Sequence, residues 1–364
     1  MKILTVVGAR PQFIKAAMVS KAIVEYNAAG LGESMEELIL HTGQHYDENM
    51  SEIFFSQMGI PKPAIMLNCG GGTHGEMTGK MLIEIERALL ENKPDKVLVY
   101  GDTDSTLAGA LAAAKLHIPV VHVEAGLRSF NKAMPEELNR ICTDHVSELL
   151  LCPTQEAVSQ LKKEGIEKGV HHVGDVMYDA AITFGKIADD SSRILCEQSL
   201  SDKGYFLVTC HRAENTDDSS RLAAIFDALK SLSSSNCPVV LPLHPRTRAR
   251  LEALGMKPES LGLKILPPIS FLDMVALEKH AVAILTDSGG VQKEAYFHAV
   301  PCVTLRDETE WVETVAAGWN TLVGADKEKI IEAAYAIKTG NAKRTAIPDY
   351  GNGHAAEKVV ELLK

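Results

Sequence analysis

Three carboxylate groups of the sequence have the positions that acid/base chemistry requires. Asp102 and Glu124 each follow a short apolar run, residues 96–100 and 118–123, of the kind typical of a buried parallel strand. Glu136 stands at the predicted start of the helix that comes next. Because ligands of open α/β sheets bind at the carboxyl ends of the strands, we expect the three acids to face one cleft and to act there as general acids or bases.

A structural reading of the same acids is also open. Acids at strand ends and in first helical turns are common caps, and each of the three taken singly is more often a cap than a catalyst. Arg128 and Arg140 lie close in sequence and would neutralise the group. Three acids that face the same cleft, with arginines beside them, favour an acid/base site.

The second half of the chain supplies histidines at predicted strand ends. His211 follows the apolar run 205–210, and His244 follows the run 239–243. A histidine in such a place can carry a proton or, as imidazolium, hold a phosphate. For His244 a purely structural role is an equal alternative.

The strongest phosphate signal is the turn Ser288-Gly289-Gly290 between an apolar run, residues 282–286, and a predicted helix start. Such a turn leaves backbone N–H groups and a hydroxyl available for a diphosphate. Glu294, one turn into the helix, is placed to accept both hydroxyls of a ribose. The alternative without function is a tight turn that needs its glycines only for the backbone, with Glu294 exposed to solvent.

A second glycine turn follows the first apolar run of the chain. Gly8 leads into a predicted helix whose first turns carry Arg10 and Lys15. A helix amino terminus with two cations nearby favours an anion site, although both side chains are equally compatible with a solvated surface.

Several well-known motifs are absent from the sequence. The first turn is not G-x-G-x-x-G, so a nicotinamide cofactor gets no support. Residues 70–80 resemble a P-loop, but position 74 is His and position 81 is Met, so we predict a mobile glycine loop leading into a helix over 81–90. The seven cysteines form no C-x-x-C pair, and no metal site is expected.

Short apolar runs alternate with helix-period stretches along the chain, which predicts an α/β fold of two Rossmann-like, doubly wound domains with a central cleft. We predict domains over residues 1–185 and 186–351, followed by a last helix, 352–364, that could pack on either domain. The predicted strands are 3–7, 38–41, 64–68, 96–100, 120–123, 148–152, 205–210, 239–243, 264–266, 282–286, 302–305 and 321–323.

Composition narrows the class of protein. The 364 residues have a formal charge of −11, which argues against a nucleic-acid partner, whose binding surface would be basic. The sequence contains no apolar run of membrane-spanning length and no signal peptide, and its scattered, odd number of cysteines fits a reducing compartment. We therefore expect a cytoplasmic protein without a membrane partner.

Six segments together resemble the non-hydrolysing UDP-N-acetylglucosamine 2-epimerase family over essentially the whole chain. They are G-A-R-P-Q-F-I-K, G-D-T-D-S-T, H-V-E-A-G-L-R, M-P-E-E-L-N-R, H-R-A-E-N and L-T-D-S-G-G-V-Q-K-E. The resemblance implies a GT-B-like fold whose last helix, 352–364, packs back on the first domain. It further implies a UDP-sugar substrate, no metal or nicotinamide cofactor, and a homodimer. It also implies inversion at C2 by elimination of UDP and its re-addition to a 2-acetamidoglucal.

The resemblance carries roles onto matching residues. It implies that Asp102, Glu124 and Glu136 form the acid/base group at C2, with Arg140 beside them and His211 near the diphosphate. The UDP-binding set it implies is Arg10, Lys15, His244, Ser288, Gly289, Gly290 and Glu294.

Several departures from the common family motifs resemble a branch that acts on UDP-2,3-diacetamido-2,3-dideoxyglucuronate, which makes precursors of surface polysaccharides. They are Ala-Arg-Pro-Gln at 9–12, Gln-Lys-Glu at 292–294, His-Pro-Arg-Thr at 244–247 and Thr-Glu-Trp-Val-Glu at 309–313. The extra carboxylate of that sugar calls for a cation, for which Lys132, Arg246 and Arg248 are candidates. The alternatives are a plain UDP-N-acetylglucosamine epimerase, a hydrolysing epimerase, a GT-B glycosyltransferase and an inactive UDP-sugar sensor.

Overall fold

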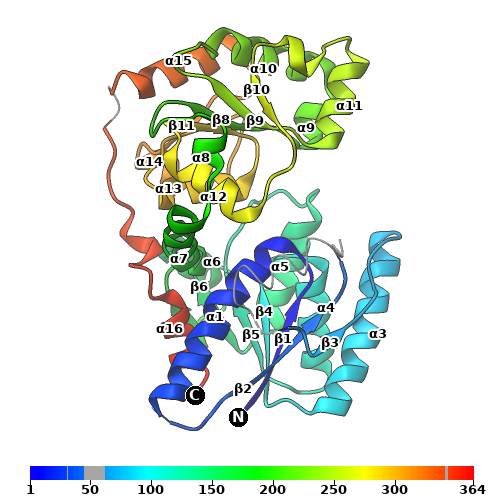
Figure 1. Ribbon diagram of the computed structural model, residues 1–364. Helices are drawn as coiled ribbons and strands as arrows, with labels where there is room; N and C mark the ends of the chain where they lie inside the picture. Colours follow the sequence, from blue (N-terminus) through cyan, green and yellow to red (C-terminus); the bar gives the residue numbers. More distant parts are fainter. Residues whose placement is uncertain (31, 45–61, 341–342) are drawn as a thin grey trace. The chain divides into compact units, whose positions relative to one another are not determined.

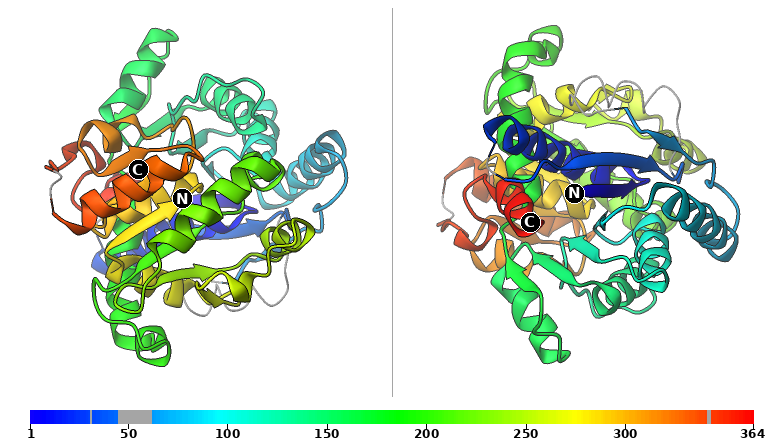
Figure 2. Two further views of the ribbon diagram at one scale, coloured as in Figure 1. Left: turned by 90° about the horizontal axis from the view of Figure 1, so that it is seen from above. Right: turned by 90° about the horizontal axis from the view of Figure 1, so that it is seen from below.

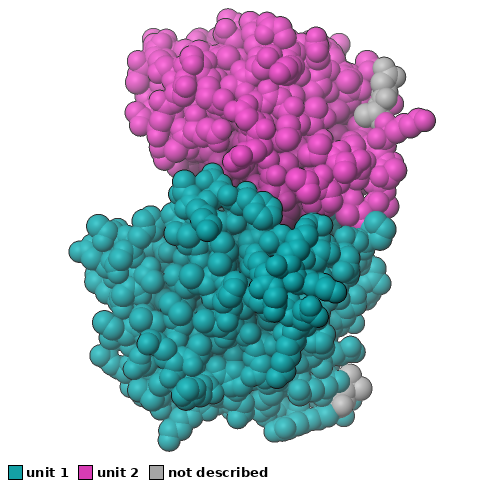
Figure 3. All heavy atoms as spheres, turned by 180° about the vertical axis from the view of Figure 1, so that it is seen from behind, with its two compact units in different colours: residues 1–180, 348–364 teal, residues 181–347 magenta. Residues whose placement is uncertain are grey.

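The computed structural model describes residues 1–30, 32–44, 62–340 and 343–364. Its fold is α/β, with two sheets whose described strand pairs are all parallel (Figure 1). The chain divides into two compact units, residues 1–180 together with 348–364, and residues 181–347 (Figure 3). Each unit contains one of the sheets, and the boundary falls inside helix α7 (Val176–Ser191).

The first unit is built on a sheet whose order, among the described residues, is β3-β2-β1-β4-β5-β6-β7. Its central strands are buried on both faces, which explains why they are continuous apolar runs in the sequence. The strands are β1 (Lys2–Val7), β2 (Glu36–His41), β3 (Ile65–Met66), β4 (Lys96–Tyr100), β5 (Val120–Val123), β6 (Leu149–Cys152) and β7 (Val170–His172).

Helices cover both faces of this sheet (Figure 1). In the described part of the unit they are α1 (Arg10–Ala29), α3 (His74–Asn92), α4 (Asp104–Lys115), α5 (Pro135–Val146), α6 (Gln155–Lys163), the start of α7, the 3₁₀ turn η2 (Pro348–Tyr350) and α16 (Ala355–Leu362). Helix α16 packs against α1 (Figure 2). The chain end is held because Lys96 Nζ donates to Leu363 O at 2.6 Å, and Asp179 accepts the backbone N–H groups of Ala355 and Ala356.

Helix α3 begins earlier than the sequence analysis predicts. The expected glycine loop ends at Thr73, and His74 already starts the helix. The cause is a capping box, in which Glu76 Oε2 accepts the Thr73 N–H at 2.9 Å and Thr73 Oγ1 accepts the Glu76 N–H at 3.4 Å. Gly75 and Gly79 are therefore helical, and the prediction of a loop up to residue 80 was wrong.

The second unit repeats the architecture with a sheet of order β10-β9-β8-β11-β12-β13 in the described chain. Its strands are β8 (Phe206–Thr209), β9 (Val239–Pro242), β10 (Lys264–Leu266), β11 (Ala283–Thr286), β12 (Cys302–Thr304) and β13 (Asn320–Leu322). Its helices, after the end of α7, are α8 (Ile194–Glu197), α9 (Ala213–Thr216), α10 (Ser219–Leu232), α11 (Pro245–Ala253), η1 (Pro258–Ser260), α12 (Phe271–His280), α13 (Gly289–Phe297), α14 (Val312–Ala316) and α15 (Lys327–Lys338).

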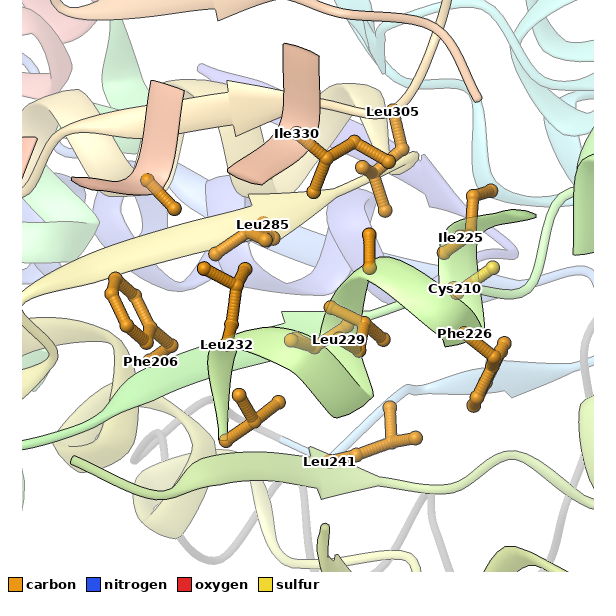
Figure 4. Packing of buried hydrophobic residues seen from close by; sticks show 14 of the residues in the cluster. Phe206, Cys210, Ile225, Phe226, Leu229, Leu232, Leu241, Leu285, Leu305 and Ile330 are labelled. Atoms are coloured by element: carbon orange, nitrogen blue, oxygen red, sulfur yellow. The ribbon is translucent and has the colours of Figure 1, made fainter. Parts of the chain in front are cut away.

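The core of the second unit shows how its layers are joined. Figure 4 shows Phe226 and Leu229 of α10 packed over Leu241 of β9, with Leu285 of β11 and Ile330 of α15 in the same cluster. All five side chains are fully buried. The apolar face of each helix is thus covered by the sheet, which stabilises the order of the strands.

Both sheets have the same topology when each is counted from its own first strand. The first unit reads 3-2-1-4 and onward, and the second, counted from β8, reads 3-2-1-4-5-6. This is the doubly wound order, and ligands of such sheets bind where the strand order reverses, outside the carboxyl ends. The reversal lies between β1 and β4 in the first unit and between β8 and β11 in the second.

Each of the twelve predicted strands overlaps an observed one, so this part of the sequence analysis is confirmed. The strand that it missed is β7, with the sequence Val-His-His. A short edge strand needs only one buried face, and a single apolar residue gives no periodic signal.

Candidate active site

The turns after β1 and β4 in the first unit are tied together by one buried side chain. Gln12 Nε2 donates to Tyr100 O at 2.8 Å and to Thr106 Oγ1 at 2.9 Å. Its Oε1 accepts the N–H groups of Gly8 at 2.8 Å and Ala9 at 2.9 Å. An amide is needed for both tasks, because an ionised carboxylate only accepts. Gln12 thus fixes the point at which the strand order of the first sheet reverses.

Two acids at this end of the sheet are paired with cations from neighbouring helices. Asp102 accepts a hydrogen bond from the Arg140 guanidinium, and Glu124 accepts one from the Lys15 ammonium. The Asp102 side chain is 32 % exposed, whereas Arg140, Lys15 and Glu124 are nearly buried. Although burial works in the opposite direction, Asp102 and Glu124 raise the pKa of Arg140, so its charge is retained. The result is a compact set of alternating charges.

The backbone beside these pairs has an unusual conformation. Glu124 has φ = 75°. This lies in the left-handed region of backbone conformation, which residues other than glycine rarely adopt. Gly101 faces the same pair, since a Cβ on it would stand 3.3 Å from Glu124 Oε2 and 3.4 Å from Lys15 Nζ. Strain of this kind persists only where the surroundings hold it, and it is concentrated at functional sites.

Of the two neighbouring acids on α5, the structure pairs Glu137 with the arginine. Glu136 is exposed in the first turn, while Glu137 is buried and accepts from Arg140 NH1 at 3.0 Å. Burial alone would raise the pKa of Glu137, but hydrogen bonds from Ser129 and Phe130 and the Arg140 charge lower it. The sequence analysis missed Glu137, although its i,i+3 spacing from Arg140 was a usable signal.

In the second unit a buried acid organises the reversal point. Asp287, directly after β11, is fully buried. Its carboxylate accepts the N–H of His211 at 3.0 Å, the N–H of Arg212 at 3.0 Å and Asn215 Nδ2 at 3.2 Å. The acid therefore holds the turn after β8 in place, as a cap holds a helix start. Sequence reasoning did not single out this role.

The two predicted histidines of this unit lie near one another. The ring centroids of His211 and His244 are 6.4 Å apart. Burial lowers the pKa of His211, and His244 and Arg212 add to the effect, although Asp287 Oδ1 at 3.7 Å from Nδ1 opposes it. This shift favours the neutral form of the His211 ring, which can accept a proton. His244 is exposed, and its Nδ1 accepts the Arg246 N–H at 3.2 Å.

Two hydrogen bonds hold the glycine turn at the start of α13, one to the end of β11 and one from the chain that follows β12. The Ser288 N–H donates to Thr286 Oγ1 at 2.9 Å, and Trp311 Nε1 donates to Gly289 O at 2.8 Å. A Cβ on Gly289 would stand 2.3 Å from Glu310 Oε1, so a larger residue there would have to displace the Glu310 carboxylate. Gly290 is exposed, and Glu294 lies half-buried one turn further on.

The other predicted cations have varied surroundings. Arg10 is the half-buried first residue of α1. Arg246 contacts Asp217 at 2.7 Å and Arg248 contacts Glu259 at 2.6 Å, both at the surface. Lys132 is exposed in the segment before α5.

The structure thus forms two local groups from the predicted residues, one in each unit. The first contains Lys15, Asp102, Glu124 and Arg140. The second contains His211 and His244 at the turns after β8 and β9, with Ser288, Gly289 and Gly290 after β11. In the described chain no three His, Cys, Asp or Glu side chains gather as metal ligands would. No helix of residues 1–30, 32–44, 62–340 or 343–364 has the length and apolar character needed to cross a membrane.

Comparison with known proteins agrees with this arrangement. The family model for UDP-N-acetylglucosamine 2-epimerase matches residues 30–364. The UDP-2,3-diacetamido-2,3-dideoxy-D-glucuronate 2-epimerase of Pseudomonas aeruginosa is 53 % identical over 366 residues, covering 100 % of this chain and 99 % of that protein. The UDP-N-acetylglucosamine 2-epimerase of Methanocaldococcus jannaschii is 45 % identical, with 100 % and 99 % covered.

Solved structures give the same result. The M. jannaschii UDP-GlcNAc 2-epimerase in complex with UDP-GlcNAc and UDP superposes with a TM-score of 0.87 at 45 % identity, covering 100 % of this chain and 99 % of that one. The Neisseria meningitidis enzyme bound to UDP-GlcNAc has a TM-score of 0.88 at 31 % identity, with the same coverage. These are enzymes of the two-domain GT-B type, and the fold predicted from the sequence is confirmed.

The chain belongs to the UDP-N-acetylglucosamine 2-epimerase family. It is accordingly an enzyme of the isomerase class, and the resemblance inferred from the six motifs is confirmed.

Proposed function

We propose that this enzyme inverts C2 of a UDP-sugar by eliminating UDP and adding it back. The observation that supports this most directly is the pairing of Asp102 with Arg140 and of Glu124 with Lys15 at one end of the first sheet. Acids held beside buried cations at a sheet's reversal point are suited to exchange a proton with a bound substrate.

The proposed reaction is balanced without an added reactant. A carboxylate removes the C2 hydrogen as a proton while the C1–O bond to UDP breaks, which leaves a 2-acetamidoglucal with a C1=C2 double bond. A second acid group returns a proton to the opposite face of C2, and the UDP oxygen bonds again to C1. We assign the acid/base work to Asp102, Glu124 and Glu136, with Arg140 holding Asp102.

The departing UDP needs stabilisation because the C2 proton is only weakly acidic. We assign UDP binding to the backbone of Ser288-Gly289-Gly290 at the start of α13, to the ribose acceptor Glu294, and to His211, His244, Arg10 and Lys15. Backbone N–H groups and cations aimed at the β-phosphate act where negative charge develops, which is the most effective place for them.

For the substrate we favour UDP-2,3-diacetamido-2,3-dideoxyglucuronate, giving the mannuronate. The support is the relative of that name, which is more similar to this chain than the UDP-N-acetylglucosamine epimerase of M. jannaschii, 53 % against 45 % identity. Arg246 and Arg248 contact acids of their own, so we assign the recognition of the sugar carboxylate to Lys132. We further propose that the enzyme is a homodimer and that its product is a precursor of surface polysaccharides.

The second candidate function is epimerisation of UDP-N-acetylglucosamine itself. Two solved relatives, at 45 % and 31 % identity, are described as complexes with UDP-GlcNAc. Both candidates use the same chemistry at C2, and they differ in the groups at C3 and C6 of the sugar.

One experiment tests the function and separates the candidates. The enzyme is incubated in deuterated water with each of the two UDP-sugars, and the sugar protons are followed by NMR. We expect deuterium at C2 with UDP still attached, and faster exchange for the diacetamido uronate. Free sugar would indicate a hydrolysing epimerase, and an unchanged C2 proton with both substrates would exclude the reaction in favour of a transferase or a sensor.

A further inference from the structure

His122, in the segment His122-Val123-Glu124, contacts the turn that carries Asp102, although the sequence motifs assigned it no role. His122 lies on β5 and is fully buried. Its Nδ1 is 2.7 Å from Asp144 Oδ1, and its Nε2 is 2.7 Å from Gly101 O. The ring therefore connects an acid on α5 with the turn that carries Asp102.

Both neighbours of the ring accept hydrogen bonds and do not donate them. Gly101 O is a carbonyl oxygen, and an ionised Asp144 offers only lone pairs. A neutral imidazole has one N–H, so it would leave one of these two close contacts between two acceptors. Both contacts are satisfied only if each ring nitrogen has a proton.

The surroundings of Asp144 favour its ionised form. Its second oxygen accepts from Arg128 NH1 at 2.7 Å and from the Gly126 N–H at 3.1 Å. Burial would raise the pKa of Asp144, but the hydrogen bonds and charges of His122 and Arg128 lower it. Arg128 in turn contacts Glu164 at 2.7 Å, so an imidazolium makes this chain of four groups neutral, with two cations and two anions.

We propose that His122 is a buried imidazolium and that it is a positioning residue for Asp102, acting through its hydrogen bond to Gly101 O. The role rests on the proposed function, whereas the charge state does not. Gly101 precedes Asp102 and adopts φ = 63° against the Lys15–Glu124 pair. Fixing the Gly101 carbonyl thus fixes the spacing between Asp102 and that pair.

A second anchor makes the geometry specific. Asn139 Nδ2 donates to Asp102 O at 3.0 Å, so the carbonyls of the two consecutive peptides that flank the Asp102 Cα are both held by side chains. A doubly protonated ring is the stronger of the two anchors, because hydrogen bonds from charged donors are shorter and more stable than neutral ones. Catalytic groups held in this way lose rate steeply when they shift by a fraction of an ångström.

The charge state is tested by NMR on the unmodified enzyme labelled with ¹⁵N-histidine at pH 7.5. We expect the His122 ring, assigned by its absence in His122→Gln, to show two protonated nitrogens. His41 serves as the internal reference for a neutral ring, since burial lowers its pKa to about 4. A His122 spectrum of the neutral type would overturn the proposal, whatever the substrate proves to be.

The positioning role is tested by comparing two substitutions of the same residue. The amide of His122→Gln still donates to Gly101 O, whereas His122→Leu fills the space without donating. We expect kcat for C2 exchange to fall at least about tenfold in the glutamine variant and about a hundredfold in the leucine variant, with KM within about twofold. Equal kcat values in the two folded variants would show that the ring only fills space.

A third variant guards against failure to fold. Asp144→Asn removes the negative partner but leaves a neutral His122 able to donate from Nε2 to Gly101 O. We expect its ring to give the neutral spectrum while C2 exchange falls less than in His122→Leu. A ring that is neutral in both the unmodified enzyme and this variant would overturn the proposal. Absence of C2 exchange in the unmodified enzyme, together with an imidazolium signal, would reject the proposed function but leave the charge state standing.

Discussion

Asp102 and Asp287 occupy equivalent places in the two sheets. Each follows the fourth strand of its sheet, at the point where the strand order reverses. Asp102 is 32 % exposed and accepts from a side-chain cation, Arg140. Asp287 is fully buried and accepts from the backbone N–H groups of His211 and Arg212.

The difference shows that the partner, rather than the position, decides what an acid at a strand end does. Asp102 is bound by a side chain and is partly open to solvent, so a substrate group can reach its carboxylate. Backbone N–H groups cannot move away, so an acid bound to them is structural. Substitutions at the two aspartates are therefore expected to give opposite results in activity and stability.

The largest effect is expected for Asp102→Asn. Loss of a general acid or base reduces a rate by about 10² to 10⁴, and we expect C2 exchange to fall by about 10³ with UDP affinity unchanged within about threefold. NMR exchange rates and calorimetric titration with UDP measure the two quantities. Asp95→Asn, at the other end of β4, is the matched control, because Asp95 accepts only at the start of the strand, from the Lys2 N–H. A loss of UDP affinity with normal exchange would reverse the assigned role.

The opposite pattern is expected for Asp287→Ala. Removing the carboxylate leaves the buried donors of His211, Arg212 and Asn215 without their acceptor, and we expect a loss of about 3 kcal/mol in the free energy of unfolding. Asp287→Asn retains one oxygen and should lose about half as much. Urea denaturation measures both, with Asp102→Asn expected within about 1 kcal/mol of the unmodified protein. If Asp287→Ala proved as stable as Asp102→Asn, the contrast between the two acids would not hold.

The sequence revealed these places, and the family resemblance put Arg140 beside the acids, but neither showed which acid pairs with which cation. Apolar runs predicted the strands, and a turn residue after a parallel strand must lie at the carboxyl edge of the sheet, so Asp102, Glu124, His211 and Ser288 were located correctly at that edge. Periodicity contains no information about which side chain meets which across 38 residues, as for Asp102 and Arg140, or across 109, as for Lys15 and Glu124.

Sequence rules for helix caps and helix faces also predicted only part of the local structure. The capping box at Thr73 was visible in the sequence, yet the glycines that follow it suggested a loop. The choice of Glu137 over Glu136 as the partner of Arg140 depends on which face of α5 is buried. The positive φ of Glu124 is set by packing around it, which a single sequence does not reveal.

A smaller effect, common to both units, is expected from one buried and one half-buried histidine. Burial lowers the pKa of His41 in the first unit and of His298 in the second to about 4, with Lys279 and Lys203 adding to the shift at His298. Their ordinary pKa is about 6.5, so between these values the unfolded chain binds protons that the folded one does not. Their contribution is complete above pH 6.5 and is lost as the pH falls towards 4, by about 2 kcal/mol for each histidine at pH 5.

Urea midpoints at pH 7.5 and pH 5 measure this loss. His41→Gln should flatten the pH dependence of the first unit, and His298→Gln that of the second, because glutamine does not titrate. A pH dependence unchanged in both variants would mean that other groups cause the acid sensitivity. The outcome shows whether the two units differ in their sites alone or also in their response to acid.

The smallest effect is expected at the support of the glycine turn. Trp311→Phe removes the N–H that donates to Gly289 O at 2.8 Å while the ring remains beneath Lys293, whose Nζ is 4.1 Å from its centroid. A lost hydrogen bond of this kind costs about 1 kcal/mol, so UDP should bind about fivefold more weakly. Trp319→Phe is the matched control, because its Nε1 donates at 2.7 Å to Thr345 O, a carbonyl away from the turn. Equal UDP affinities in the two variants would show that the turn needs no such support. Weaker binding in Trp311→Phe alone would show that the second unit binds UDP through the placement of its backbone.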